Sequence, residues 1–135
     1  MNRSLDTCLI LSLILGVPEN QYDAVYNLLS TEGQIYHIYD IAISEAVHVL
    51  ETRYHYSREK IVSSMNTILA EFDDNLEYNS TLFWLVFPYY EHHKTMSFND
   101  CMMVFYAQIG QTEPLLTFDK ALARSHPSAK LLATS

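Results

Sequence analysis

Residues 114–124 read PLLTFDKALAR, and this stretch decides how the chain is expected to fold. Pro114 to Thr117 has the character of a short strand, and Asp119 follows near its carboxyl end. Lys120 to Arg124 then predicts a short helical turn. A strand that leads to a carboxylate and then to a helix is typical of parallel α/β sheets, in which chemistry lies at the carboxyl ends of the strands.

The same arrangement opens the chain. Ser4-Leu5 is a candidate strand, Asp6 ends it, and Gly16 with Pro18 beyond it stops the helix that follows. Strands alternate with helices between these two points, so we expect an α/β fold with a parallel sheet covered on both faces. The other predicted strands are Gln34–Ile38, Asn75–Tyr78 and Ala129–Ala133. The predicted helices are Thr7–Leu15, Glu19–Leu29, Asp40–Tyr54, Ser57–Phe72, one from Asn79 or Ser80 to Pro88, and Ser97–Ile109. The last of these is expected to have Ser97 as its N-cap in a capping box with Asp100, and it is apolar on every side, which predicts central burial.

Length and composition favour one globular domain over residues 1–135. The chain is 49% hydrophobic and 18% charged, which allows a sizeable core. No apolar run approaches the roughly 20 residues of a membrane helix, and the first residues fit a signal peptide poorly. We therefore expect a cytoplasmic protein without a membrane partner. The two cysteines, Cys8 and Cys101, are expected to be reduced and packed.

The net charge of −8 argues against nucleic-acid binding, because phosphate contacts need Lys and Arg. The charge is unevenly distributed, however. Residues 1–93 have four basic and thirteen acidic residues, whereas residues 94–135 have four basic and three acidic ones. Lys94, Lys120 and Arg124 are candidates for holding an RNA backbone, with an ordinary solvated surface as the alternative.

Four acidic residues lie where a carboxylate is expected to be costly. Asp6 and Asp119 end predicted strands, and Glu45 and Asp100 lie in the apolar stretches IAISEAVHVL and SFNDCMMVFYAQIG. A lone buried charge is expensive, and the chain offers few cations to pair these acids. Convergence on a divalent metal would remove that cost and predicts a metal-dependent hydrolase. Oxygen ligands favour Mg²⁺ or Mn²⁺.

Each acid also has a structural explanation. Asp100 and Asp119 could only cap the helices that they begin, and Glu45 could pair with Arg53 or Arg58. Adjacent histidines at positions 92 and 93 do not predict a zinc site, because neighbouring residues on a helix point in different directions.

Four segments, taken in order, resemble the PIN-domain ribonucleases, and above all the VapC-type toxins of bacterial toxin–antitoxin pairs. The segments are LDT before an apolar helix, SEAVHVLETRYHYSREKI, SFNDCMMVFYA and LLTFDKALAR. The resemblance covers nearly the whole chain. It implies a PIN-like three-layer α/β sandwich, with a short parallel central sheet of four or five strands flanked by about seven helices.

The resemblance also implies a function and a site. It identifies Asp6, Glu45, Asp100 and Asp119 as the acidic metal-binding quartet, and Thr117 as the polar residue that accompanies the last acid. It implies RNA cleavage that depends on Mg²⁺ or Mn²⁺, with a protein antitoxin as partner and a homodimer as the assembly.

Two residues depart from the family pattern, since Cys8 replaces a small polar residue and Ser97 replaces an acid. A catalytically degenerate PIN-like module that binds RNA or protein therefore stays an alternative, which Cys8 and the acidic balance favour and the intact quartet opposes. A phosphoryl-accepting receiver fits less well, because the lysine that it needs is not at the required spacing. The aromatic run around Pro88 is expected to serve partly the core and partly an interface; it comprises Phe83, Trp84, Phe87, Tyr89 and Tyr90.

Overall fold

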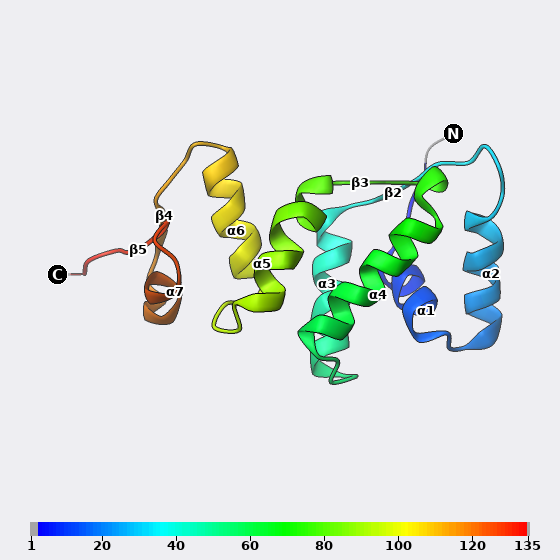
Figure 1. The fold of residues 1–135 in the computed structure, drawn as a ribbon, viewed down its shortest axis with the longest axis horizontal. Helices are drawn as coiled ribbons and strands as arrows, with labels where there is room; N and C mark the ends of the chain where they lie inside the picture. Colours follow the sequence, from blue (N-terminus) through cyan, green and yellow to red (C-terminus); the bar gives the residue numbers. More distant parts are fainter. Residues whose placement is uncertain (1–2, 135) are drawn as a thin grey trace. The chain divides into compact units, whose positions relative to one another are not determined.

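The computed structural model describes residues 3–134, which contain seven α-helices and five short parallel strands. The expected α/β class is confirmed. The chain divides into two compact units, Met1–Ser80 and Thr81–Ser135, which we call the N-terminal unit and the C-terminal unit (Figure 1). Each unit has its own sheet, where the sequence predicted one central sheet. The expectation of a single domain stays a prediction.

The N-terminal unit contains a parallel sheet of order β1-β2-β3. Its strands are β1 (Arg3–Ser4), β2 (Tyr36–Ile38) and β3 (Leu76–Tyr78). Its helices are α1 (Thr7–Leu15), α2 (Glu19–Leu29), α3 (Asp40–Thr52) and α4 (Arg58–Glu71), and a 3₁₀ turn at Asp73–Asn75 precedes β3.

Local sequence signals explain where these helices begin and end. Gly16 ends α1 in the left-handed conformation, with φ at 72°, which glycine adopts without steric cost. Ser57 caps α4, since its hydroxyl accepts a hydrogen bond from the Lys60 N–H at 3.1 Å. The predicted bounds of α1 and α2 are confirmed, and α3 ends two residues before the expected position.

The two faces of the three-stranded sheet differ in character. Tyr36, Ile38 and Leu76 are buried, and the helices lie on one side of the sheet in the edge-on view of Figure 1. The strand register aligns Ser4 with His37 and His37 with Glu77, and none of these three is buried. Because side chains alternate across a strand, these polar residues form an open row on the other face.

The C-terminal unit is smaller, and its sheet pairs β4 with β5 in parallel. A π-helical turn (Leu82–Val86, η2) leads into α5 (Phe87–His92) and then α6 (Phe98–Ile109). The chain ends with β4 (Leu115–Thr117), α7 (Lys120–Ser125) and β5 (Ala129–Leu131).

Pro88 does not end its helix. The backbone before it widens into the π turn, in which the Phe87 N–H bonds to the Leu82 carbonyl five residues earlier. Proline has no N–H and crowds the preceding turn, so the wider turn lets the helix continue past it. The helix expected over this aromatic run is therefore present, but its geometry differs from the predicted one.

Helix α6 was expected to be buried on every side. Phe98, Cys101 and Val104 are buried, but Met103 is 45% exposed and Ile109 is 56% exposed. The helix therefore buries one face, and the prediction of all-round burial is wrong. Across residues 3–134, no helix combines the length and apolar character needed to cross a membrane.

Candidate functional site

Asp6 lies just beyond the carboxyl end of β1 and is the N-cap of α1. Its Oδ1 accepts a hydrogen bond from the Thr7 N–H at 2.6 Å. Leu5, immediately before it, is buried and donates its N–H to the His37 carbonyl at 2.9 Å, which fixes the backbone at this point. One oxygen of the Asp6 carboxylate thus serves the helix, and the other makes no hydrogen bond within residues 3–134.

Glu45 lies on α3, 39 positions after Asp6, yet one residue connects the two. The Thr7 hydroxyl lies 3.1 Å from Glu45 Oε2 and 3.2 Å from the Ala42 carbonyl oxygen. It has a single proton, so the two acceptors share it. Thr7 thus holds Asp6 through its N–H and Glu45 through its hydroxyl. Sequence reasoning missed Thr7, although its position directly after Asp6 was the available signal.

Asp100 is the third residue of α6. Its N–H donates to the hydroxyl of the N-cap Ser97 at 3.1 Å, as the sequence predicted. The carboxylate itself makes no hydrogen bond or ion pair within the described residues, so the reciprocal half of a capping box is not formed. The Asp100 side chain therefore makes no capping hydrogen bond, although its place in the first turn of α6 is still favourable for the helix dipole.

Asp119 follows β4 and caps α7. Its Oδ1 accepts hydrogen bonds from the N–H groups of Ala121, at 2.9 Å, and Leu122, at 3.1 Å. The hydroxyl of Thr117 in turn accepts the Asp119 N–H at 2.9 Å. The structural explanation of Asp119 as a cap is confirmed, and Thr117 positions its backbone. The second carboxylate oxygen takes no part in the cap.

The premise that these acids are buried is wrong. Asp6, Glu45 and Asp119 are exposed, and Asp100 is half-buried. Their backbones lie beside core residues, but helix ends and helix surfaces turn the carboxylates to solvent. Glu45 does not pair with Arg53 or Arg58, since its partner among the described residues is Thr7. The cost of burying these carboxylates therefore does not require a metal ion, and only their positions in the fold favour one.

The quartet is divided between the units. Asp6 and Glu45 belong to the N-terminal unit and are joined by Thr7, whereas Asp100 and Asp119 belong to the C-terminal unit. Within residues 3–134, no three His, Cys, Asp or Glu side chains lie close enough together to hold a metal ion. Convergence of all four acids on one metal stays a prediction.

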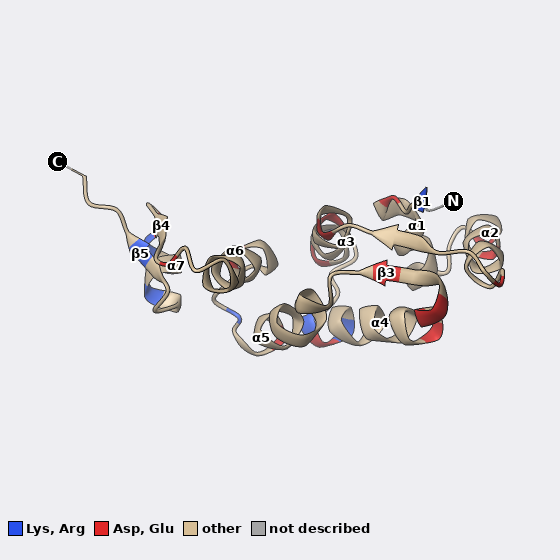
Figure 2. Ribbon diagram, turned by 90° about the horizontal axis from the view of Figure 1, so that it is seen from above, with Lys and Arg blue, Asp and Glu red and all other residues tan. Residues whose placement is uncertain are grey.

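Charge separates the units as well (Figure 2). The N-terminal unit has twelve acidic and four basic residues, and the C-terminal unit has four of each. Lys94, Lys120 and Arg124 are exposed. Any contact with RNA phosphates is therefore expected to come mainly from the C-terminal unit.

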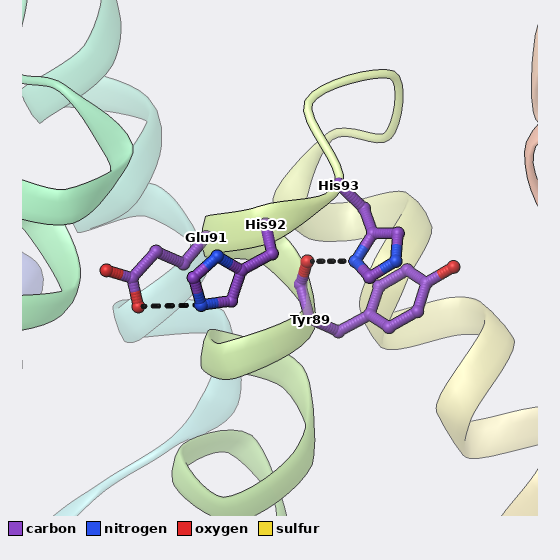
Figure 3. Close-up of polar contacts among 4 residues, drawn as sticks. All are labelled: Tyr89, Glu91, His92 and His93. Carbon is purple, nitrogen blue, oxygen red and sulfur yellow. Dashed lines mark hydrogen bonds and ion pairs between the residues drawn. The ribbon is translucent and has the colours of Figure 1, made fainter.

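The two adjacent histidines of α5 and its C-cap point in different directions, as expected (Figure 3). His92 Nε2 lies 4.0 Å from Glu91 Oε2. His93 Nδ1 donates to the Tyr89 carbonyl at 2.9 Å, and its ring stacks on the Tyr89 ring at a centroid distance of 3.6 Å. His93 thus closes the end of the helix.

Both cysteines are free thiols, as predicted, but only Cys101 is packed in the core. Cys8 is exposed and lines a groove of about 520 Å³ between α1 and α2, together with Leu9 and Leu28. The expectation that Cys8 is a packed core residue is wrong.

A polar network in the C-terminal unit was not foreseen from the sequence. Ser128 donates its hydroxyl to Glu113 Oε2 and accepts from Gln108 Nε2 at 3.0 Å, and its N–H donates to His126 Nδ1 at 3.0 Å. His126 and Ser128 are both buried. Burial lowers the pKa of His126, the charge of Glu113 opposes that shift, and His93 adds to it. The network connects α6 to the two strands.

Comparison with family models, with curated proteins and with solved structures gave no match to this chain.

Proposed function

We propose that this chain is a divalent-metal-dependent endoribonuclease, with Asp6, Glu45, Asp100 and Asp119 as its metal ligands. The observation that supports it most is the pairing of Asp6 with Glu45 through Thr7, at the carboxyl edge of a parallel sheet. Thr7 contacts both of these acids, which are distant in sequence, and neither acid forms an ion pair within residues 3–134. Open α/β sheets bind their ligands at that edge.

The chemistry of the donor set fits Mg²⁺ or Mn²⁺. All four candidates are carboxylates, and Asp6 and Asp119 each use one oxygen for a helix cap and keep the other. Hard divalent ions take oxygen ligands and leave positions for water and phosphate. When bound, such an ion stabilises the negative charge that develops on the phosphate oxygens during cleavage.

The remaining roles fall to side chains around the acids. Thr7 orients Glu45, and Thr117 holds the backbone of Asp119 in place. Lys120 and Arg124, both exposed on α7 next to Asp119, would hold the RNA backbone.

We further propose that the protein acts in the cytoplasm and has a protein partner, with an antitoxin or a second copy as the candidates. Trp84 is 79% exposed and Leu85 is 43% exposed on the π turn. Large exposed apolar side chains next to each other are typical of interfaces.

A catalytically degenerate RNA- or protein-binding module is the second candidate function. It is favoured by the acidic N-terminal unit and by the exposed Cys8, which departs from the family pattern. It predicts RNA binding without cleavage.

RNA cleavage separates the two candidates. The purified full chain is incubated with labelled single-stranded RNA in Mg²⁺, in Mn²⁺ and in EDTA. Cleavage is expected with either metal and not in EDTA. Asp6→Asn and Asp100→Asn should each lower the rate of cleavage. The loss should exceed the roughly ten- to hundred-fold caused by changing residues that only support the metal ligands. Asn keeps the oxygen that caps α1, so folding should be preserved.

The matched control is Asp23→Asn, which removes an exposed acid from α2. This variant should cleave like the parent chain. Equal cleavage by the Asp6 and Asp100 variants would overturn the assignment of the site, and RNA binding without any cleavage would favour the degenerate module.

A further inference from the structure

A cavity of about 540 Å³ lies at the carboxyl ends of β2 and β3, entirely within the N-terminal unit. It continues the open face of the sheet, because His37 and Glu77 are register neighbours on that face and both line it. Its volume is in the range of about 300–1,000 Å³ typical of small-ligand sites.

Ring surfaces form one part of this cavity. Tyr39 follows β2 and is 61% exposed, and its ring lies 19° from parallel to that of His37 at a centroid distance of 6.3 Å. Ile41, at the start of α3, is 71% exposed beside them. Exposed aromatic faces of this kind are the platforms on which unpaired bases stack.

Acceptor groups form the other part. Glu77 Oε2 lies 3.2 Å from His37 Nε2, which orients the carboxylate, and Glu77 Oε1 makes no hydrogen bond within residues 3–134. Asp40 adds a second carboxylate, whose Oδ2 accepts from Asn79 Nδ2 at 3.3 Å. None of the lining residues is Lys or Arg. A cavity lined by carboxylates repels a phosphate, so a ligand must offer donors and a flat face.

We propose that this cavity binds a nucleobase of single-stranded RNA, and guanine in preference to the other bases. Guanine presents two neighbouring N–H donors, at N1 and N2, which a single carboxylate can accept together. On the corresponding edge, each of the other bases has an acceptor beside its donor. That acceptor would face the Glu77 carboxylate and would be repelled by it. The proposal rests on the proposed ribonuclease function, because it names the feature of the RNA that the same unit recognises.

The position of the cavity relative to Asp6 and Glu45 supports this proposal. Ile41 lines the cavity, and Glu45 lies four residues further along α3, on the same face of the helix. A base seated against Tyr39 would therefore lie about one helical turn from the Glu45 carboxylate. That arrangement would present a phosphodiester next to the base to the proposed metal ligands.

Binding can be measured without catalysis. Fluorescence anisotropy in EDTA would follow the full chain with short single-stranded oligonucleotides that contain one guanosine, inosine or adenosine in a uridine background. Inosine lacks only the N2 amine. We expect guanosine to bind roughly ten-fold more tightly than inosine, and Glu77→Gln to remove that preference. Tyr39→Ala should weaken all three by roughly ten-fold, because stacking is indifferent to the base edge.

Matched controls are Glu32→Gln and Tyr54→Ala, which change exposed residues outside the cavity and should bind like the parent chain. If RNA is cleaved but guanosine and inosine bind equally, or if Glu77→Gln keeps the preference, the base site is refuted and the ribonuclease stands. Guanosine preference lost in Glu77→Gln, in a chain that does not cleave, would support the base site and refute the ribonuclease. Absence of RNA binding by the parent chain would refute the base site.

Discussion

The N-terminal unit and the C-terminal unit are built from different kinds of side chain. The N-terminal unit packs mainly aliphatic residues, such as Ile43, Leu50 and Ile61, between regular helices and its sheet. The C-terminal unit packs an aromatic cluster, in which Phe87 contacts Phe98 at a centroid distance of 4.9 Å and Tyr90 contacts Phe98 edge-on at 5.5 Å. Aliphatic periodicity predicts regular helices well, whereas bulky rings around a proline allow several local geometries.

The units also differ in what they can offer to RNA. The N-terminal unit has a net charge of −8 and an acidic cavity, whereas the C-terminal unit is neutral and exposes Lys120 and Arg124. RNA phosphates favour the exposed cations of the C-terminal unit, whereas the N–H donors of base edges favour the acidic cavity of the N-terminal unit. A negative net charge therefore does not by itself exclude RNA binding when the charges are separated in this way.

The largest expected effect concerns the aromatic core. Phe87 is 1% exposed, so Phe87→Ala should lower the free energy of unfolding by about 3–5 kcal/mol, through lost burial and a cavity. Leu50→Ala, at a fully buried position of the N-terminal unit, should cost about 2–5 kcal/mol. Urea denaturation measures both. Ile109→Ala is the control and should change the value by no more than about 0.5 kcal/mol, because the side chain is 56% exposed and lies outside the proposed interface. A Phe87→Ala cost below that of Ile109→Ala would mean that the rings do not form a core.

A smaller effect is expected for the hydroxyl that joins the first two acids. Thr7→Val keeps the shape of the side chain but removes the donor to Glu45 and Ala42, which should cost about 1 kcal/mol of stability. It should also weaken Mn²⁺ binding roughly ten-fold, because Glu45 loses the group that orients it. Thermal melts and calorimetric titration measure the two effects, with Thr7→Ser as the control that keeps the hydroxyl. Mn²⁺ binding by Thr7→Val equal to that of the parent chain would remove Thr7 from the site.

The smallest effect concerns pH and the C-terminal unit. Burial lowers the pKa of His126 below its ordinary value of 6.5, so the unfolded chain binds this proton more readily than the folded one. The stability that His126 contributes is fully present above about pH 6.5 and is lost as the pH falls from there through the lower folded pKa. Melting temperatures measured between about pH 7.5 and pH 5 should therefore decline.

His126→Asn tests this directly, because the amide oxygen can accept the Ser128 N–H in place of Nδ1 but does not titrate. The decline should become shallower in this variant and should be unchanged in His92→Asn, which alters an exposed histidine. An identical slope in the parent chain and in His126→Asn would contradict the assignment.

Particular residues show how far the sequence could predict this molecule. Gly16, Ser57 and Ser97 act through local backbone chemistry, so the helix ends that they set were predictable. The exposure of Asp6 and Glu45 was not, because it depends on how a helix is turned about its own axis by distant packing. The hydroxyl of Thr7 and the buried network around Ser128 join residues far apart in sequence, which no local pattern reports.

The central proposal is that the four acids are ligands of one metal ion, and Mn²⁺ calorimetry on a double-mutant cycle tests it most directly. Asp6→Asn, Asp100→Asn and the double variant are titrated beside the parent chain, with Asp23→Asn as the control. For one shared site, each single change should weaken Mn²⁺ binding strongly, and the double change should weaken it by much less than the two effects added together. Undiminished binding by Asp100→Asn, or strictly additive effects, would contradict the proposal that these acids bind one metal ion.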